Sequence, residues 1–199
     1  MTGVAIIDSG GANIASLIFA FERLQIDAVL TSNADTIKNA DRVVLPGVGA
    51  AKDAMARLSA TGLVDVIREL TQPVLGICLG MQLLCDGSEE EDVECLGVVS
   101  GAVKKLQPHQ SHRVPNMGWC STQFTHEHPV FAGIDEGSYF YYLHSYALPV
   151  SANTLATADH ANKFSAIVGK ENFIAVQFHP ERSAAAGARL LKNFVELPA

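Results

Sequence analysis

The sequence has few cysteines, few basic residues and a net negative charge. Its four cysteines, at positions 78, 85, 95 and 120, form no Cys-x-x-Cys pair, which argues against a disulfide-stapled scaffold. Only 14 Lys and Arg stand against 21 Asp and Glu, and the formal net charge is −7. A protein that binds phosphate backbones needs a basic surface, so we expect no nucleic acid partner.

Export and membrane signals are also missing. The first ten residues, MTGVAIIDSG, carry no basic region, and Asp8 interrupts their apolar run, so the pattern is not that of a signal peptide. No apolar stretch reaches the roughly 18 residues that a membrane-spanning helix needs. We therefore expect a cytoplasmic protein with reduced thiols and no membrane contact.

What the sequence does have is many short apolar runs, with 48% hydrophobic residues in all. In the first half, strands are predicted at 4–7, 28–31, 42–45 and 74–77, and helices at 14–24, 50–59 and 62–71. Strands and helices that alternate over short connections predict an α/β fold. Its central sheet should be mostly parallel and covered by helices on both faces.

The second half is richer in strand patterns. Strands are predicted at 96–106, 118–124, 139–143, 154–158, 164–168 and 173–178, before a final helix at 184–197. Hairpin-like spacing near 97–106 and 163–177 predicts additional antiparallel strands. No repeat or linker is visible, so we predict one domain over residues 1–199.

A cysteine between two glycines follows the predicted strand 74–77, in the segment Gly76-Ile77-Cys78-Leu79-Gly80. A buried structural cysteine is the simplest interpretation of a thiol in an apolar run. The segment also has the pattern of a nucleophile elbow, with sulfur in place of oxygen. A helix that starts there would favour the thiolate, and the Leu79 N–H could stabilise an oxyanion.

A thiolate nucleophile needs a base, and His144 and His179 each follow a strand-like run. His179 is better placed, because Pro180 ends its strand and Glu181 can orient the imidazole. A core histidine without a role is the alternative. The order Cys…His-x-Glu indicates acyl transfer through a thioester. No ligand spacing predicts a metal site among the remaining histidines, His109, His112, His126, His128 and His160.

Two loops remain. Pro46-Gly47-Val48-Gly49 ends a predicted strand and matches neither a dinucleotide fingerprint nor a P-loop. Its N–H groups could complete an oxyanion hole, and a plain turn is the alternative. The acidic run 89–92 is interpreted as a solvated loop with no function.

Together these segments resemble the class I (triad) glutamine amidotransferases from end to end. The motifs of the whole group are GxCxGxQ, within PVLGICLGMQLL, and FHPE, within VQFHPERS. The segments IIDSGGANIASL, LPGVGAAKDAM, VPNMGWC and YFYYLHSYAL are similar to the histidine-biosynthesis branch, the glutaminase subunits of imidazole glycerol phosphate synthase. The resemblance implies a flavodoxin-like α/β fold and no cofactor.

The resemblance also implies roles for individual residues. The triad would be Cys78, His179 and Glu181, the oxyanion hole Val48 and Leu79, and the glutamine site Gly49, Gln82, Ser145 and Tyr146. Residues that would face a partner are Asn13, Trp119, Tyr141 and Arg182. The implied partner is a separate (β/α)₈-barrel cyclase subunit. It would use the released ammonia to make imidazole glycerol phosphate and aminoimidazole carboxamide ribotide.

The sequence departs from the family pattern at two positions. The usual Pro-His-Met-Gly-Trp-Asn is here Pro-Asn-Met-Gly-Trp-Cys, with Asn116 and Cys120 as the changed residues. Neither change touches the implied triad. One alternative is the glutaminase subunit of anthranilate or aminodeoxychorismate synthase, but their usual Asp-Ser-Phe-Thr start differs from residues 8–13. A non-catalytic scaffold is a further alternative, and the presence of all three implied triad residues argues against it.

Overall fold

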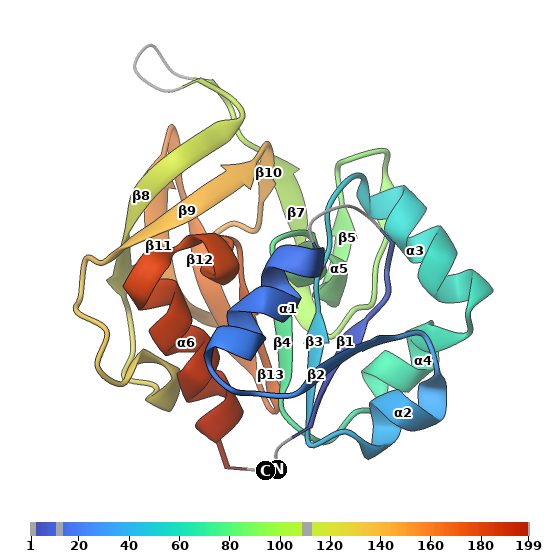
Figure 1. The fold of residues 1–199 in the computed structure, drawn as a ribbon. Coiled ribbons are helices and arrows are strands. Elements are labelled where there is room, and N and C mark those ends of the chain that lie inside the picture. The colour runs from blue at the N-terminus through green and yellow to red at the C-terminus, as the bar shows by residue number, and fades with distance from the viewer. Residues whose placement is uncertain (1–2, 11–13, 109–112, 199) are drawn as a thin grey trace.

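The computed structural model describes residues 3–10, 14–108 and 113–198, which form helices on both faces of a β-sheet (Figure 1). The strands are β1 (Val4–Ile7), β2 (Ala28–Thr31), β3 (Arg42–Leu45), β4 (Val74–Ile77), β5 (Cys85–Ser88), β6 (Val93–Glu94), β7 (Val99–Lys105), β8 (Asn116–Phe124), β9 (Tyr139–His144), β10 (Tyr146–Ala147), β11 (Thr154–His160), β12 (Asn162–Lys170) and β13 (Phe173–Val176). The helices are α1 (Ile14–Arg23), α2 (Ala34–Asn39), α3 (Ala51–Ala60), α4 (Leu63–Arg68), α5 (Leu79–Leu84) and α6 (Ala184–Glu196), with 3₁₀ turns η1 (Pro129–Phe131) and η2 (Pro180–Arg182).

The main sheet has the strand order β2-β1-β3-β4-β13-β12-β11-β8-β9 in the described residues. Strands β2, β1, β3, β4 and β13 run parallel to one another. From β13 onward each neighbouring pair is antiparallel. A second sheet has the order β10-β7-β5-β6. The predicted α/β fold with antiparallel strands in the second half is confirmed, and the central sheet is mixed.

The core lies on both sides of the parallel strands, which explains their continuous apolar runs. Side chains alternate along β1: Val4 and Ile6 join a buried cluster with α1 and α6, and Ala5 and Ile7 join a second cluster with α2 to α5. Figure 1 shows α1 and α6 side by side on one face. The helices cover both faces of the sheet. The loops that follow β3, β4 and β13 therefore meet at the carboxyl ends of these parallel strands.

Several predicted elements differ from the structure. The hairpin-like pattern near 163–177 is confirmed as β12 and β13, which are antiparallel. Residues 97–106 contain a single strand, β7, rather than a hairpin, and the antiparallel partner of β7 is β10. Strand β13 ends at Val176 rather than at 178. Helix α2 and strands β5, β6 and β10 were not predicted from the sequence. No helix in the described residues is long and apolar enough to cross a membrane.

Candidate active site

Cys78 lies in a sharp turn between β4 and α5. Its backbone has φ 53° and ψ −108°, a conformation that costs energy in a residue with a side chain. A Cβ on Gly80 would lie only 1.8 Å from the Leu45 carbonyl oxygen, so only glycine fits where α5 crosses β3. The elbow predicted from the two glycines is therefore present, and Cys78 is 7% exposed.

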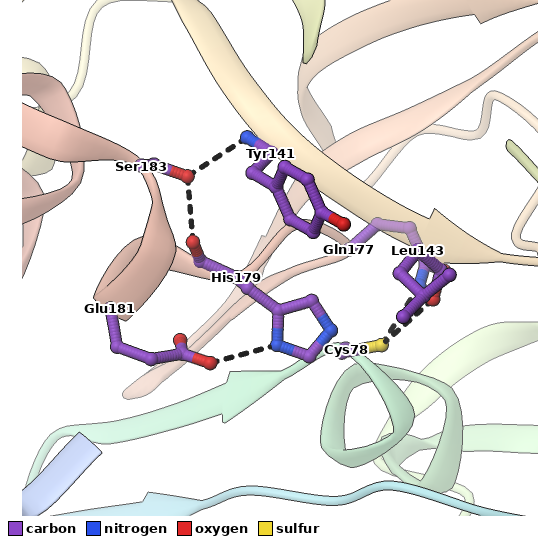
Figure 2. Close-up of polar contacts among 7 residues, drawn as sticks. All are labelled: Cys78, Tyr141, Leu143, Gln177, His179, Glu181 and Ser183. Atoms are coloured by element: carbon purple, nitrogen blue, oxygen red, sulfur yellow. Dashed lines mark hydrogen bonds and ion pairs between the residues drawn. The ribbon is translucent and has the colours of Figure 1, made fainter. Parts of the chain in front are cut away.

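His179 reaches Cys78 from the neighbouring strand. Strands β4 and β13 are parallel with Ile77 opposite Val176, so residues beyond both ends lie together. The Nδ1 atom of His179 is 2.9 Å from Oε1 of Glu181, and both side chains are at most 6% exposed. Figure 2 shows the imidazole between the carboxylate and the thiol. The structure thus brings the three residues of the predicted triad together.

Ser183 holds the backbone of His179 in place. Its hydroxyl donates to the His179 carbonyl oxygen (2.6 Å) and accepts from the Tyr141 N–H (2.9 Å) (Figure 2). The His179 N–H in turn donates to the Tyr141 carbonyl oxygen at 2.9 Å. These bonds tie η2 to β9, so the imidazole is held from two strands. No sequence pattern indicated this role for Ser183, because its two partners lie on different elements.

Electrostatics favour a charged imidazole at position 179. Burial by itself would lower the pKa of His179, but hydrogen bonds to Cys78 and Glu181, and the negative charges of both partners, raise it to about 10. At neutral pH the His179 imidazole is therefore protonated, with the Cys78 sulfur on one side and the Glu181 carboxylate on the other. A cation beside a cysteine favours the ionised form of sulfur, which is the nucleophile.

The thiol faces a cleft of about 520 Å³, a size suited to a small molecule. Its lining includes Cys78, His179 and the residues for which the sequence predicts oxyanion or glutamine contacts, namely Val48, Gly49, Leu79, Gln82, Ser145 and Tyr146. Gly49 has φ +93° and open space around it, so the loop after β3 presents backbone to the cleft. The loop after β3, the residues after β9 and the residues after β13 thus converge on the Cys78 sulfur.

Glu90 also lines the cleft, although the sequence suggested only a solvated loop there. Its Oε2 accepts a hydrogen bond from the Ala51 N–H at 3.2 Å, at the start of α3. Glu89 points elsewhere: its exposed carboxylate binds the Lys105 N–H and Lys104, which lower its pKa. An acidic run alone could not separate these two neighbours, because the difference comes from contacts with distant residues.

His144 is the second histidine on the cleft wall, and its partners are neutral. Its Nε2 is 3.1 Å from the Asn116 side-chain amide, and its Nδ1 is 2.9 Å from the Tyr146 carbonyl oxygen. Burial, the largest effect, lowers the pKa of His144 to about 4, so the ring is neutral at pH 7. The unusual Asn116 is buried and serves as the donor that pairs with this ring. The other unusual residue, Cys120, is half-buried with its Sγ 3.3 Å from the Asp159 carbonyl oxygen.

An aromatic face lies beside the mouth of the cleft, on β8 and β9. We define it by residues whose side chains share one side of these strands: Met117, Trp119, Tyr139, Tyr141 and Leu143. Trp119 is 53% exposed, and its ring packs edge-to-face on Tyr141 with 6.2 Å between the ring centroids. The guanidinium carbon of Arg182 lies 4.4 Å from the centroid of the Tyr141 ring. Leu143 belongs to both the face and the cleft lining. The predicted partner residue Asn13 lies outside the described residues.

Metal ligation finds no support in the side chains that are described. Across residues 3–10, 14–108 and 113–198, no group of three or more His, Cys, Asp or Glu side chains is placed to hold an ion. His109 and His112 lie outside these ranges.

Comparison with known sequences agrees with this geometry. The family model described as glutamine amidotransferase class-I matches residues 5–197. Proteins named imidazole glycerol phosphate synthase subunit HisH are similar over nearly their whole length. The one from Xanthomonas axonopodis pv. citri is 50% identical over 99% of this chain and 98% of the relative. The one from Xylella fastidiosa is 48% identical over the full length of both chains.

Solved structures with low sequence identity share the fold. A structure described as a glutamine amidotransferase has a TM-score of 0.75 at 18% identity, over 97% of this chain and 97% of that one. The PurLQS structure from Thermotoga maritima has a TM-score of 0.73 at 17% identity, over 98% and 97%. The chain therefore belongs to the class-I glutamine amidotransferase family and, within it, to the family of the HisH subunits of imidazole glycerol phosphate synthase.

Proposed function

We propose that this chain is the glutaminase subunit of an imidazole glycerol phosphate synthase, with residues 1–199 as a single glutamine amidotransferase domain. The observation that carries the proposal is a buried Cys78, His179 and Glu181 at the ends of adjacent strands, in a chain about half identical to HisH proteins. The subunit hydrolyses L-glutamine to glutamate and ammonia.

The reaction follows from the polarity of the site. The Cys78 thiolate attacks the side-chain carbonyl carbon of glutamine, and the oxygen becomes an oxyanion bound by the N–H groups of Val48 and Leu79. The His179 imidazolium then gives its proton to the leaving nitrogen, so ammonia departs and a thioester remains. His179, now neutral, takes a proton from water as it attacks the thioester. Glutamate leaves, and the thiolate is restored.

Other groups in the cleft suit the two ends of an amino acid. Gly49, Gln82, Ser145 and Tyr146 hold the α-amino and carboxylate groups in this proposal. The Glu90 carboxylate adds a negative charge at the cleft wall, which is complementary to an α-ammonium group. Since binding both ends fixes the distance to the carboxamide, the same contacts select glutamine over shorter amides.

The HisH relatives are named as subunits, so a partner chain is expected. We propose a (β/α)₈-barrel cyclase that docks on the aromatic face. Exposed Trp and Tyr beside an Arg are typical of interface hot spots, and this face borders the cleft from which ammonia must leave. Asn13, Trp119, Tyr141 and Arg182 contact the partner in this proposal. Because Cys78 must stay a free thiol, we also propose a cytoplasmic location.

Reconstitution tests the proposal. The chain is mixed with the cyclase, L-glutamine and the cyclase substrate, and glutamate and imidazole glycerol phosphate are measured. We expect both products to form in equal amounts. Parallel mixtures contain the synthase subunits of anthranilate and aminodeoxychorismate synthase, the alternative partners. Glutamate release that is coupled to one of those partners, and not to the cyclase, would overturn the assignment.

A further inference from the structure

Gln177 is a buried polar residue that the reaction above does not use. It lies one residue beyond β13, it is 0% exposed, and its N–H donates to the Ala166 carbonyl oxygen at 2.9 Å. The opposite residue beyond β4 is Cys78, since Val176 pairs with Ile77. Gln177 and His179 are two residues apart, so their side chains can approach the sulfur together.

The side chain of Gln177 bridges the nucleophile and the cleft wall. Its Nε2 donates to Cys78 Sγ at 3.8 Å, a contact drawn in Figure 2. Its Oε1 accepts from Nε2 of Gln82 at 3.1 Å. The second N–H of the Gln82 amide donates to the Tyr146 carbonyl oxygen at 2.9 Å. A chain of hydrogen bonds therefore runs from the sulfur to two residues of the proposed glutamine site.

The orientation of the Gln177 amide is determined by these partners. If the amide were flipped, its oxygen would face the sulfur and its NH₂ would face the NH₂ of Gln82. Both contacts would place like partial charges together at a buried site, so only the observed orientation satisfies the network.

The sulfur has a second contact of opposite character. The Leu143 carbonyl oxygen, on β9, lies 3.8 Å from Cys78 Sγ and can accept a proton from the thiol but repels a thiolate. The Gln177 N–H does the reverse, because a donor stabilises the anion. The titratable side chains that line the cleft around the sulfur are Glu90, His144, Tyr146, His179 and Arg182. The balance between thiol and thiolate thus depends on a neutral donor as well as on these groups.

We propose that Gln177 stabilises the Cys78 thiolate and links the nucleophile to the glutamine contacts at Gln82. The catalytic part of this inference rests on the proposed function. The contact between Gln177 and Cys78 is independent of it. Substrate that binds Gln82 orders the Gln177 amide, and the amide then holds the sulfur in the attacking position. Loss of the Gln177 amide should therefore affect both turnover and glutamine affinity.

The test uses the alkylation of Cys78 by iodoacetamide in the full chain, with the modified residue identified by peptide mass spectrometry. The second-order rate is measured between pH 5 and pH 10. In Gln177→Met the rate at pH 7 should fall about tenfold, because one donor to an anion is lost, and the midpoint of the profile should move to higher pH. The control is Gln72→Met, the same change at the other end of β4, where Gln72 donates to the Ile37 carbonyl oxygen; its profile should match the wild type.

A second variant, Gln177→Glu, keeps the size of the side chain and the acceptor for the Gln82 amide, but it places an acceptor against the sulfur, so alkylation should slow further. A folded Gln177→Met or Gln177→Glu protein with the wild-type profile would overturn the proposal. Alkylation needs no glutamine, so a shifted profile with no glutaminase activity in the wild-type complex would refute the proposed function alone. In an active complex, Gln177→Met should lower kcat and raise KM, whereas a purely structural role would leave the alkylation midpoint unchanged.

Discussion

Two buried histidines, His144 and His179, line the same cleft, but their pKa values are shifted in opposite directions. His179 and His144 are 5% and 6% exposed, but the pKa of His179 is raised to about 10 and that of His144 is lowered to about 4. Burial disfavours the charge at both positions. The difference comes from their partners: a thiol and a carboxylate at His179, and an amide and a carbonyl at His144. A buried histidine is protonated in this fold where ionisable groups surround it.

The largest effect is expected when the nucleophile is removed. Cys78→Ala should lower glutamine-dependent synthesis by the complex more than about 10⁴-fold. Synthesis from ammonium salts should survive, because the cyclase chemistry lies in the partner. The pKa of His179 should fall as well, toward that of His144, since one negative partner is gone. Cys120→Ala is the control, and an equal loss of glutaminase activity in that folded variant would contradict the assignment of Cys78.

Replacement of the carboxylate should have the next largest effect. Glu181→Gln keeps the size of the side chain and an acceptor for the hydrogen bond, but it removes the charge that stabilises the His179 imidazolium. We expect turnover to fall by about 10²–10⁴-fold with glutamine binding retained. The measurement is kcat and KM for glutamate release by the complex. An unchanged kcat would show that Glu181 has only a structural role.

The fold and the triad could be predicted from the sequence because their determinants are local. An apolar run, two glycines and a proline define β4, the elbow at Cys78 and the position of His179. Helix α2 was missed although Asn33 is a typical N-cap residue whose side chain accepts from the Thr36 N–H, because six residues are too few to show an apolar periodicity. Gln177 and Glu90 were missed for a different reason. Their partners, Gln82 and Ala51, are far away in the sequence, and no pattern records such contacts.

The low pKa of His144 predicts sensitivity to acid. The unfolded chain binds a proton at this residue below pH 6.5, but the folded chain does so only below about pH 4. Stability is therefore lost as the pH falls through this window, by up to about 3 kcal/mol. Urea unfolding at pH 7, 6, 5 and 4 measures the loss. His144→Gln should flatten the dependence, and an equally steep curve in that variant would assign it to other groups.

The smallest effect on activity is expected when His144 is given a carboxylate partner, as His179 has. Asn116→Asp replaces its amide partner with a carboxylate, which should raise the pKa of His144 by about 1–3 units above its low value. Glutaminase activity should change little by comparison with the Glu181 variant. NMR titration of the histidine rings follows the pKa. A value that stays near 4 would mean that burial, rather than the charge of the partner, determines the state of His144.

The most direct measurement of the thiolate–imidazolium pair is the ¹⁵N NMR spectrum of the histidine rings at pH 8, with His179 and His144 assigned by substitution. His179 should carry protons on both ring nitrogens, His144 should be neutral, and Cys78→Ala should reduce the protonation of His179. A neutral His179 at pH 8 in the wild-type protein would contradict the thiolate–imidazolium pair, and with it the proton donation by His179 in the proposed reaction.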